Sequence, residues 1–269
     1  MLIANGMAKR AARFLECLRF GYVLMCEGKD AHKYFAAHRC DFRFCPNCAP
    51  RMFRQLYERY SPLLAHISAH ARKGFRLREI TLTSVNTGTL TSQQIKQFNQ
   101  HVKKTLKQLM RGVDGWGAIW SDEVGHNNLN LHAHVLFYGP YIEQRELAKA
   151  WHAVSGHQVV WIKKAAQSGS NALLYLLKYV SKPPANNPDL IGHLEVAFYG
   201  CRRVHTVGLF YNFKATGAHQ LKDDLNQCPR CDAKLRRVRG TYRIEDLALQ
   251  GIPFIGAYSR YQEKKSWLN

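Results

Sequence analysis

The chain has 269 residues, of which 39 are Lys or Arg and 19 are Asp or Glu, so its net charge is +20. A hydrophobic content of 46% excludes a disordered tail and is enough for one large domain, or a catalytic domain with small appendages. No segment approaches the roughly 18 uninterrupted apolar residues of a membrane-spanning helix, and residues 1–19 lack the apolar core of a secretory signal. The basic excess therefore favours a cytoplasmic protein that binds nucleic acid.

The first cysteine cluster lies within residues 1–50, which are predicted to be irregular. Cys45 and Cys48 form a Cys-Pro-x-Cys pair, the tight turn in which two thiolates chelate zinc. Cys26 and Cys40 lie upstream of this pair and complete a set of four ligands. Disulfides are not expected in a chain without export features. Cys17 is interpreted as a buried apolar residue.

Helix and strand periods alternate along the middle of the chain. In chain order we expect a helix over 51–71, a strand over 77–84, a helix over 91–110, strands over 115–124 and 130–138, a helix over 143–154, a strand over 157–163 and a helix over 170–182. Thr91 is expected to cap the second helix, with Gln94 completing a capping box. Pro183 and Pro184 are expected to stop the last helix. Weaker strand candidates are residues 193–199 and 203–210.

This order predicts an α+β fold in which an antiparallel central sheet carries helices on one face. We expect a cysteine-rich zinc-binding region with a helix over residues 1–72, a catalytic domain over 73–215 and a basic tail over 216–269. The tail contains a second Cys-Pro-x-Cys pair, Cys228 and Cys231, which could close a zinc site with the first pair across the fold. Spare ligand candidates are His38, His205 and His219, and Cys201 is left undecided.

Two histidines stand one residue apart in an alternating apolar segment, Leu129–Phe137. Successive side chains on a strand point to opposite faces, so His132 and His134 are expected to project from the same face. Neighbouring imidazoles on a rigid strand can be ligands for a divalent cation. Taken alone, the pair fits the solvated face of an amphipathic strand equally well.

Two tyrosines lie four residues apart on the predicted helix 170–182, so Tyr175 and Tyr179 share one helix face. Lys178 and Lys182 each follow a tyrosine by three residues. A tyrosine hydroxyl is a poor nucleophile near neutral pH because its ordinary pKa is about 10. A nearby cation stabilises the phenolate, and a Tyr-x-x-Lys turn supplies one. Such a turn in isolation is usually structural, and this one gains meaning because it follows the paired histidines.

Three motifs follow one another along the chain, namely Ile80-Thr-Leu-Thr83, His132-Ala-His134 and Tyr-x-x-Lys. Together they resemble the motifs of the HUH endonuclease superfamily. More narrowly, they resemble rolling-circle plasmid replication initiators, in which a motif like Arg43-Phe-Cys45-Pro-Asn-Cys48 precedes the catalytic domain. The chain is also similar to two-tyrosine transposases of the Helitron kind, which share a cysteine-rich amino terminus and a tyrosine helix followed by prolines. The resemblance covers about Cys26 to Phe210.

The resemblance implies an HUH- or RRM-like palm that nicks single-stranded DNA with the help of a metal ion. His132 and His134 would hold Mg or Mn together with a third ligand. Glu123 is the first candidate for this ligand, and Asp122 and His126 are its rivals. The cation would polarise the scissile phosphate and offset charge in the transition state.

The resemblance also implies that a tyrosine attacks the phosphate, which leaves a 5′-phosphotyrosine link and a free 3′-hydroxyl for a polymerase to extend. Tyr179 is the first candidate nucleophile and Tyr175 the second. In one-tyrosine initiators a glutamate often occupies the place of Tyr175. A tyrosine at this place indicates either a second nucleophile or a structural residue.

The implied partners are single-stranded and origin DNA, a host polymerase, and a host helicase because the chain lacks a phosphate-binding loop. Aromatic side chains available for stacking on bases are Trp116, Trp120, Trp151, Trp161 and Tyr138, most of which are expected in the core. Arg202 and Arg203 are candidates for phosphate contacts. Two alternatives stay open, a transposase with the same chemistry and a zinc-bearing DNA-binding protein without catalysis.

Overall fold

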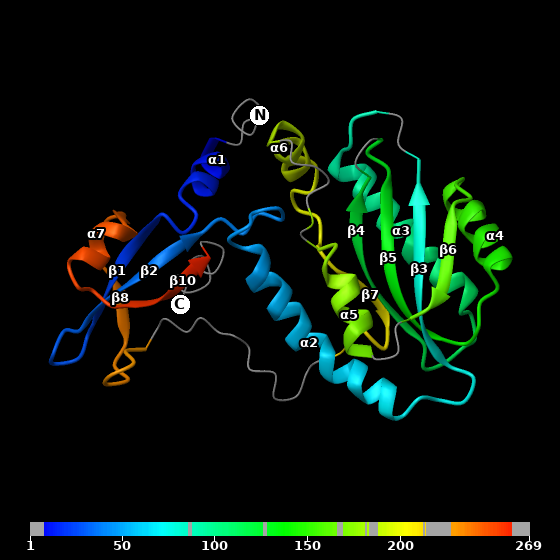
Figure 1. Cartoon of the computed structure of the whole chain (residues 1–269), viewed down its shortest axis with the longest axis horizontal. Helices are drawn as coiled ribbons and strands as arrows, with labels where there is room; N and C mark the ends of the chain where they lie inside the picture. The colour runs from blue at the N-terminus through cyan, green and yellow to red at the C-terminus, as the bar shows by residue number, and fades with distance from the viewer. Residues whose placement is uncertain are drawn as a thin grey trace. The chain divides into compact units, whose positions relative to one another are not determined.

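The computed structural model describes residues 8–85, 88–125, 128–165, 169–180, 182, 188–211, 213 and 227–259. The chain divides into two compact units (Figure 1). Unit 1 consists of Met1–Arg51 and His219–Asn269, and unit 2 of Met52–Ala218. No helix in the described part of the chain combines the length and the apolar character needed to cross a membrane.

Unit 1 is built around one five-stranded sheet to which both ends of the chain contribute. β1 (Phe20–Cys26) pairs antiparallel with β2 (Lys33–Arg39), with β8 (Leu235–Arg237) and with β9 (Tyr242–Arg243), while β10 (Phe254–Ser259) pairs with β2 in parallel. Two short helices complete the unit, α1 (Ala8–Leu15) and α7 (Ile244–Leu249).

The prediction that residues 1–50 are irregular is wrong, because this region forms α1, β1 and β2. The two strands are buried on both faces. Tyr22 and Leu24 pack in one apolar cluster with Cys228, whereas Val23 packs on the other side with Leu247 of α7. A strand covered on both faces reads as a continuous apolar run and gives no alternating signal in the sequence.

Unit 2 contains a five-stranded sheet in the order β6-β3-β5-β4-β7, in which every pair is antiparallel. Its strands are β3 (Arg76–Ser84), β4 (Gly117–Val124), β5 (Leu131–Gly139), β6 (Val160–Lys164) and β7 (His205–Gly208). Its helices are α2 (Ala49–Ala69), which belongs to this unit from Met52 on, α3 (Ser92–Leu109), α4 (Gln144–Ser155), α5 (Gly169–Leu177) and α6 (Pro188–Ala197). The predicted α+β class with an antiparallel sheet is confirmed.

The two faces of this sheet carry different helices (Figure 1). α3 and α4 cover one face, where Phe98 and Trp151 meet edge to face with their ring centroids 5.8 Å apart. α2 and α5 pack over part of the other face, in a cluster that contains Ile119 and Leu136 of the sheet. Helices therefore lie on both faces of the sheet.

Most predicted elements of unit 2 are present, including the capping box between Thr91 and Gln94. Two differ. Helix α5 ends at Leu177, five residues before the predicted end, and Tyr179 lies in the turn that follows, while Pro183 and Pro184 lie outside the described residues. Residues 193–199, predicted as a strand, belong mostly to helix α6, in which Leu194 and Ala197 are buried three residues apart.

Candidate functional site

The pairing of β4 with β5 places three candidate metal ligands on one face of the sheet of unit 2. Glu123 lies directly opposite His132, and His134 lies two residues further along the same face of β5, opposite Ser121. Asp122, the rival to Glu123, lies opposite Ala133 and therefore points to the other face. The other rival, His126, lies outside the described residues.

Glu123 is the centre of a short polar chain. Nε2 of His134 donates to its Oε2 over 2.7 Å, and Nζ of Lys182 donates to its Oε1 over 2.6 Å. Burial alone would raise the pKa of Glu123, but the hydrogen bonds from His134 and Lys182 outweigh it and lower that pKa to about 2. The carboxylate is therefore ionised and carries cationic or donor groups on both oxygens.

His132 is held at the neighbouring position by Thr83. Its Nδ1 lies 2.9 Å from the Thr83 hydroxyl. Burial, together with the nearby His134, lowers the pKa of His132, so the neutral imidazole that binds metals is favoured. This arrangement fits the orienting hydrogen bond that metal-binding histidines commonly make through their second nitrogen.

The donor set of two imidazoles and one carboxylate suits a divalent cation, although the three side chains do not form a closed ligand cage. Among the described residues, the groups of three or more candidate ligands that lie within 4.8 Å of one another do not include these three side chains. The ammonium of Lys182 occupies the carboxylate oxygen that a metal ion would also use. Binding of a metal ion would therefore displace Lys182 and the Nε2 proton of His134.

The tyrosine pair lies directly over these residues. The ring of Tyr179 stacks on His134 with a centroid separation of 3.6 Å and an interplanar angle of 4°. The Tyr179 hydroxyl donates to the hydroxyl of Tyr175 over 3.0 Å. Burial and this hydrogen bond raise the pKa of Tyr179 above its ordinary value. Tyr179 is buried at 6% exposure, whereas Tyr175 is half-buried.

Both lysines of the Tyr-x-x-Lys turns lie near the tyrosine rings. Nζ of Lys178 is 3.8 Å from the centroid of Tyr175 and 4.7 Å from that of Tyr179, and Nζ of Lys182 is 5.5 Å from that of Tyr179. These cations would stabilise a phenolate on either ring. The structure thus brings the histidine pair, Glu123 and both tyrosines together on one face of the sheet.

Asp122 has a structural environment instead. It is buried at 1% exposure, its Oδ2 accepts a hydrogen bond of 2.7 Å from Asn99 of α3, and Nε2 of His205 lies 3.7 Å from the same oxygen. The Asn99 side chain in turn accepts a 2.6 Å hydrogen bond from the indole of Trp120. This network ties α3 to β4 on the face away from the histidine pair.

The first cysteine group in unit 1 differs from the predicted set of four, because Cys17 takes the place of Cys26. Sγ of Cys17 lies 3.6 Å from that of Cys48 and 3.7 Å from that of Cys45, and Cys40 lies 3.7 Å from Cys48. Hydrogen bonds from the other three thiols, that of Cys17 first, lower the pKa of Cys48. All four side chains are buried, so Cys17 is both a buried residue and a candidate ligand.

The second group joins Cys26 to the distant pair Cys228 and Cys231, with His32 as the fourth member. Sγ of Cys26 and Cys231 are 3.3 Å apart, and Nδ1 of His32 lies 3.5 Å from Cys228 and 3.8 Å from Cys231. The second pair therefore does not join Cys45 and Cys48. Both groups have the donor chemistry of a structural zinc site, so unit 1 could hold two zinc ions.

His32 was not predicted as a ligand because two of its partners, Cys228 and Cys231, lie about 200 residues away along the chain. The only available signal was its position in the tight segment between two strands, six residues after Cys26. The predicted spare ligands are elsewhere: His38 and His205 belong to neither group, and His219 lies outside the described residues. Cys201 also lies outside both groups, with its Sγ 3.8 Å from the backbone oxygens of Ser92 and Ala197.

The aromatic candidates for base stacking divide clearly by exposure. Trp120, Trp151 and Tyr138 are core residues, and Trp116 is partly buried against the α2 and α5 cluster. Trp161 is 61% exposed on the edge strand β6. Of the two predicted phosphate contacts, Arg202 is exposed and Arg203 is half-buried.

Residues 78–184 match the model of a family of replication-associated proteins, the ORF2 family. This segment is less than half of the chain, and it contains the histidine pair, Glu123 and both tyrosines. Searches of curated proteins and of solved structures found no match. The family match supports a replication initiator that binds DNA.

Proposed function

We propose that the protein initiates replication by nicking one DNA strand at an origin, using a tyrosine nucleophile and a divalent metal ion. One observation supports this above all others: the ring of Tyr179 lies 3.6 Å from that of His134, whose Nε2 contacts Glu123. A candidate nucleophile thus stacks on one candidate ligand, His134, which in turn contacts a second, Glu123. The match of residues 78–184 to a replication-associated family supports the same conclusion.

In this proposal His132, His134 and Glu123 would hold Mg or Mn, and the ion would polarise the scissile phosphate. The oxygen of a tyrosine forms a bond to phosphorus while the bond from phosphorus to the 3′ oxygen breaks. The phenol proton leaves to solvent, and the departing 3′ oxygen takes up a proton from water. The products are a 5′-phosphotyrosine and a free 3′-hydroxyl from which a polymerase can extend.

The two tyrosines have complementary properties as nucleophiles. Tyr179 lies closer to the metal ligands, and Lys178 and Lys182 both approach its ring. Tyr175 is more exposed, and its oxygen accepts the hydrogen bond from Tyr179, which stabilises negative charge on Tyr175. We propose Tyr179 as the first nucleophile and Tyr175 as the second.

Formation of a covalent protein–DNA adduct tests the proposal. Wild type is incubated with Mn and a pool of single strands of random sequence, and adducts are resolved on a denaturing gel. Tyr179→Phe is expected to abolish the adduct, because it removes the first nucleophile. Tyr175→Phe is expected to reduce the amount of adduct, because it removes the second. Tyr141→Phe is a matched control, because this tyrosine of unit 2 is 72% exposed and lies outside the site.

Metal dependence is tested with His134→Ala, which is expected to weaken Mn binding and abolish the adduct. His152→Ala on α4 is the control, since His152 is exposed and lies on the helix layer of the opposite sheet face. An adduct that persists in the double variant Tyr175→Phe/Tyr179→Phe would refute the tyrosine mechanism. Tight DNA binding without any adduct would favour the non-catalytic alternative.

A transposase with the same chemistry is the second candidate. The observation that favours it is the pair of hydroxyls 3.0 Å apart, because two adjacent nucleophiles can hold two strand ends in turn. If each single tyrosine variant still forms an adduct and only the double variant does not, both tyrosines act, and this branch gains weight over the one-tyrosine initiators.

A further inference from the structure

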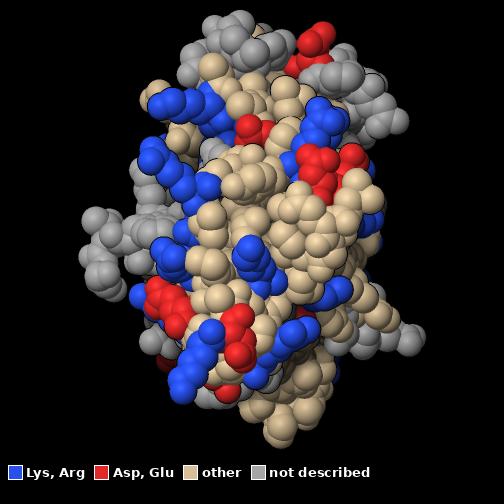
Figure 2. All heavy atoms as spheres, turned by 90° about the vertical axis from the view of Figure 1, so that its left-hand side faces the viewer, with Lys and Arg blue, Asp and Glu red and all other residues tan. Residues whose placement is uncertain are grey.

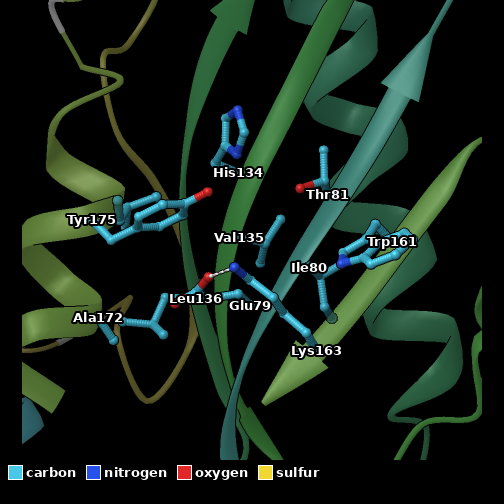
Figure 3. Close-up of a pocket in the computed structure, with 11 residues that line it drawn as sticks. Glu79, Ile80, Thr81, His134, Val135, Leu136, Trp161, Lys163, Ala172 and Tyr175 are labelled. Carbon is cyan, nitrogen blue, oxygen red and sulfur yellow. Dashed lines mark ion pairs between the residues drawn. The ribbon is translucent and has the colours of Figure 1, made fainter. Parts of the chain in front are cut away.

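A pocket lies beside the tyrosine pair, between α5 and the edge strand β6 of unit 2. Its volume is about 140 Å³, and its polar and aromatic lining consists of Glu79, Thr81, His134, Trp161, Lys163 and Tyr175. In Figure 3, Tyr175 and Trp161 project from opposite sides of the pocket, above the strands that form its floor. The pocket shares His134 and Tyr175 with the candidate active site, so whatever occupies it lies next to the reacting phosphate.

The size of the pocket suits a single planar ring. A closed apolar cavity of about 150 Å³ accepts a molecule as large as benzene. A pocket of 140 Å³ that is open on one side therefore accepts the six-membered ring of a pyrimidine base. It has no room for a sugar and phosphate as well, which would stay at the open mouth, near the tyrosines.

The walls have the chemistry that single-stranded nucleic acids require. Trp161 lies on the face of the sheet that carries His134, because it pairs across from Thr81, which pairs across from His134. Its side chain is 61% exposed, although indole is among the largest apolar groups. Exposed aromatic rings beside basic groups are the usual stacking platforms for unpaired bases.

The rim of the pocket supplies hydrogen-bonding groups for the edge of a base. Nζ of Lys163 lies 3.0 Å from Oε2 of Glu79 and 5.1 Å from the centroid of Tyr175. Figure 3 marks this ion pair with a dashed line. Lys163 can donate to a ring nitrogen or carbonyl, Glu79 can accept from an exocyclic amine, and Thr81 can do either.

We propose that this pocket binds one pyrimidine base of the single strand, next to the nick, and so selects the sequence that is cut. The inference rests on the proposed function for the position of the scissile phosphate. Trp161 stacks on the base, while Glu79 and Lys163 contact its edge. Trp161 thus determines sequence specificity, a role separate from those of the nucleophile and the metal ligands.

The experiment measures equilibrium binding with Mg and Mn left out and no chelator added, so that it does not depend on cleavage and keeps any zinc in unit 1. Strands that bind are selected from a pool of short single strands of random sequence, and each nucleotide of a selected strand is then replaced in turn by an abasic one. We expect one position at which the abasic change weakens binding to wild type by roughly 10- to 100-fold, as for the loss of one stacked base. A pyrimidine is expected at this position in the selected strands.

The protein variant must act on the same contact. Trp161→Ala is expected to weaken binding of the intact strand by a similar factor and to make the abasic change at that position silent. Trp161→Phe keeps a ring and is expected to lose less. Val159→Ala is the matched control, because Val159 lies just before β6, is 58% exposed and does not line the pocket.

Two results would overturn the inference. In the first, Trp161→Ala binds the selected strand as tightly as wild type does. In the second, Trp161→Ala weakens binding, but each abasic change weakens binding to the variant by the same factor as it weakens binding to wild type. The outcome separates from that of the proposed function. Base-dependent binding at Trp161 without any covalent adduct would leave the pocket standing and remove the nicking mechanism. An adduct that forms with no dependence on Trp161 would do the reverse.

Discussion

Replacing Cys17 by serine is expected to remove one of two zinc ions from the protein. The change takes one thiolate from the group formed with Cys40, Cys45 and Cys48 and leaves the second group intact. Serine has nearly the shape of cysteine, but its hydroxyl is a poor zinc ligand near neutral pH. The change therefore tests ligation and alters packing little.

The geometry of the first group supports tetrahedral coordination. With a zinc–sulfur distance of about 2.3 Å, the edges of a regular tetrahedron of sulfurs are about 3.8 Å long. The sulfur of Cys17 lies 3.6 Å and 3.7 Å from those of Cys48 and Cys45, so the thiols are already near these positions. Structural zinc contributes an apparent ~10–16 kcal/mol at neutral pH in small domains. Loss of this ion is thus expected to unfold the segment around Cys17 and Cys40.

The assay counts zinc per chain in protein purified without added metal, together with hydrogen exchange of the backbone. Wild type is expected to hold two equivalents and Cys17→Ser one. Backbone amides near Cys40 should exchange faster in the variant, whereas those of unit 2 should not change. Cys201→Ser is the control, since Cys201 belongs to unit 2 and to neither group, and it should keep both ions.

The reasoning is wrong if Cys17→Ser retains both zinc ions with native exchange. It is also wrong if Cys26→Ser loses the same ion as Cys40→Ser, because the structure assigns Cys26 and Cys40 to different groups. In that case the set of four predicted from sequence, with Cys26 in place of Cys17, would be the correct one.

Two further predictions concern the two faces of strand β4. Asn99→Ala is expected to lower the free energy of unfolding of unit 2 by about 2–3 kcal/mol, because it removes a hydrogen bond from each of the buried groups of Asp122 and Trp120. Denaturant titrations measure this change, with Gln100→Ala at the exposed neighbouring position as the control. Equal unfolding midpoints for Asn99→Ala and Gln100→Ala would contradict the network. Glu123→Gln mimics the protonated carboxyl, and the pKa of Glu123 is lowered from 4.5 to about 2. Wild type without Mg or Mn is therefore expected to be more stable than the variant above pH ~4.5. It is expected to lose this advantage as the pH falls towards 2. The difference is at most about 3 kcal/mol, and screening at the partly exposed Lys182 makes it smaller; a difference that does not change with pH would contradict the assigned hydrogen bonds.

Strand alternation made the face of the histidine pair predictable, together with most of unit 2. The alternation around the histidine pair and the capping box at Thr91 are local signals, and both appear in the structure, the alternation in the burial of residues 131–134. The end of α5 was not predictable from proline. Tyr179 and Val180 instead bond to carbonyls three residues back, so the helix tightens before the prolines are reached.

The composition of the cysteine groups depends on contacts that no spacing rule contains. Cys26 lies at the end of β1 and meets Cys231 only because β8 pairs antiparallel with β1, with Cys26 opposite Leu235. The sequence motif Cys-x4-Cys-x2-Cys identifies Cys40, Cys45 and Cys48 as one group, but the fourth candidate ligand depends on the tertiary structure. Cys17, which lies in the turn before β1, groups with Cys40, Cys45 and Cys48, whereas Cys26 at the end of β1 does not.

Basic side chains outnumber acidic ones on one face of the molecule, which agrees with a role in DNA binding. Figure 2 shows Lys and Arg spread over the face of the molecule at the left of Figure 1, with fewer acidic groups among them. The segment that contains Arg236, Arg237 and Arg239 is part of this unit. Because phosphate contacts by such residues give affinity without direct sequence preference, the proposed selection of a cut site would depend on groups that contact bases.

The opposite orientations of Glu123 and Asp122 divide the proposed metal site from a structural network within one strand. Glu123 contacts His134 and Lys182 on one face of the sheet, whereas Asp122 contacts Asn99 on the other. The sequence offers both carboxylates equally, and only the pairing of β4 with β5 decides between them. If this division is correct, variants of Asn99 change the free energy of unfolding but leave the metal affinity of the folded protein unchanged. Variants of Glu123, in contrast, change the metal affinity even under conditions in which the protein is fully folded. A metal ion bound through Asp122 would couple the two effects, since its ligand would then belong to the network that ties α3 to the sheet.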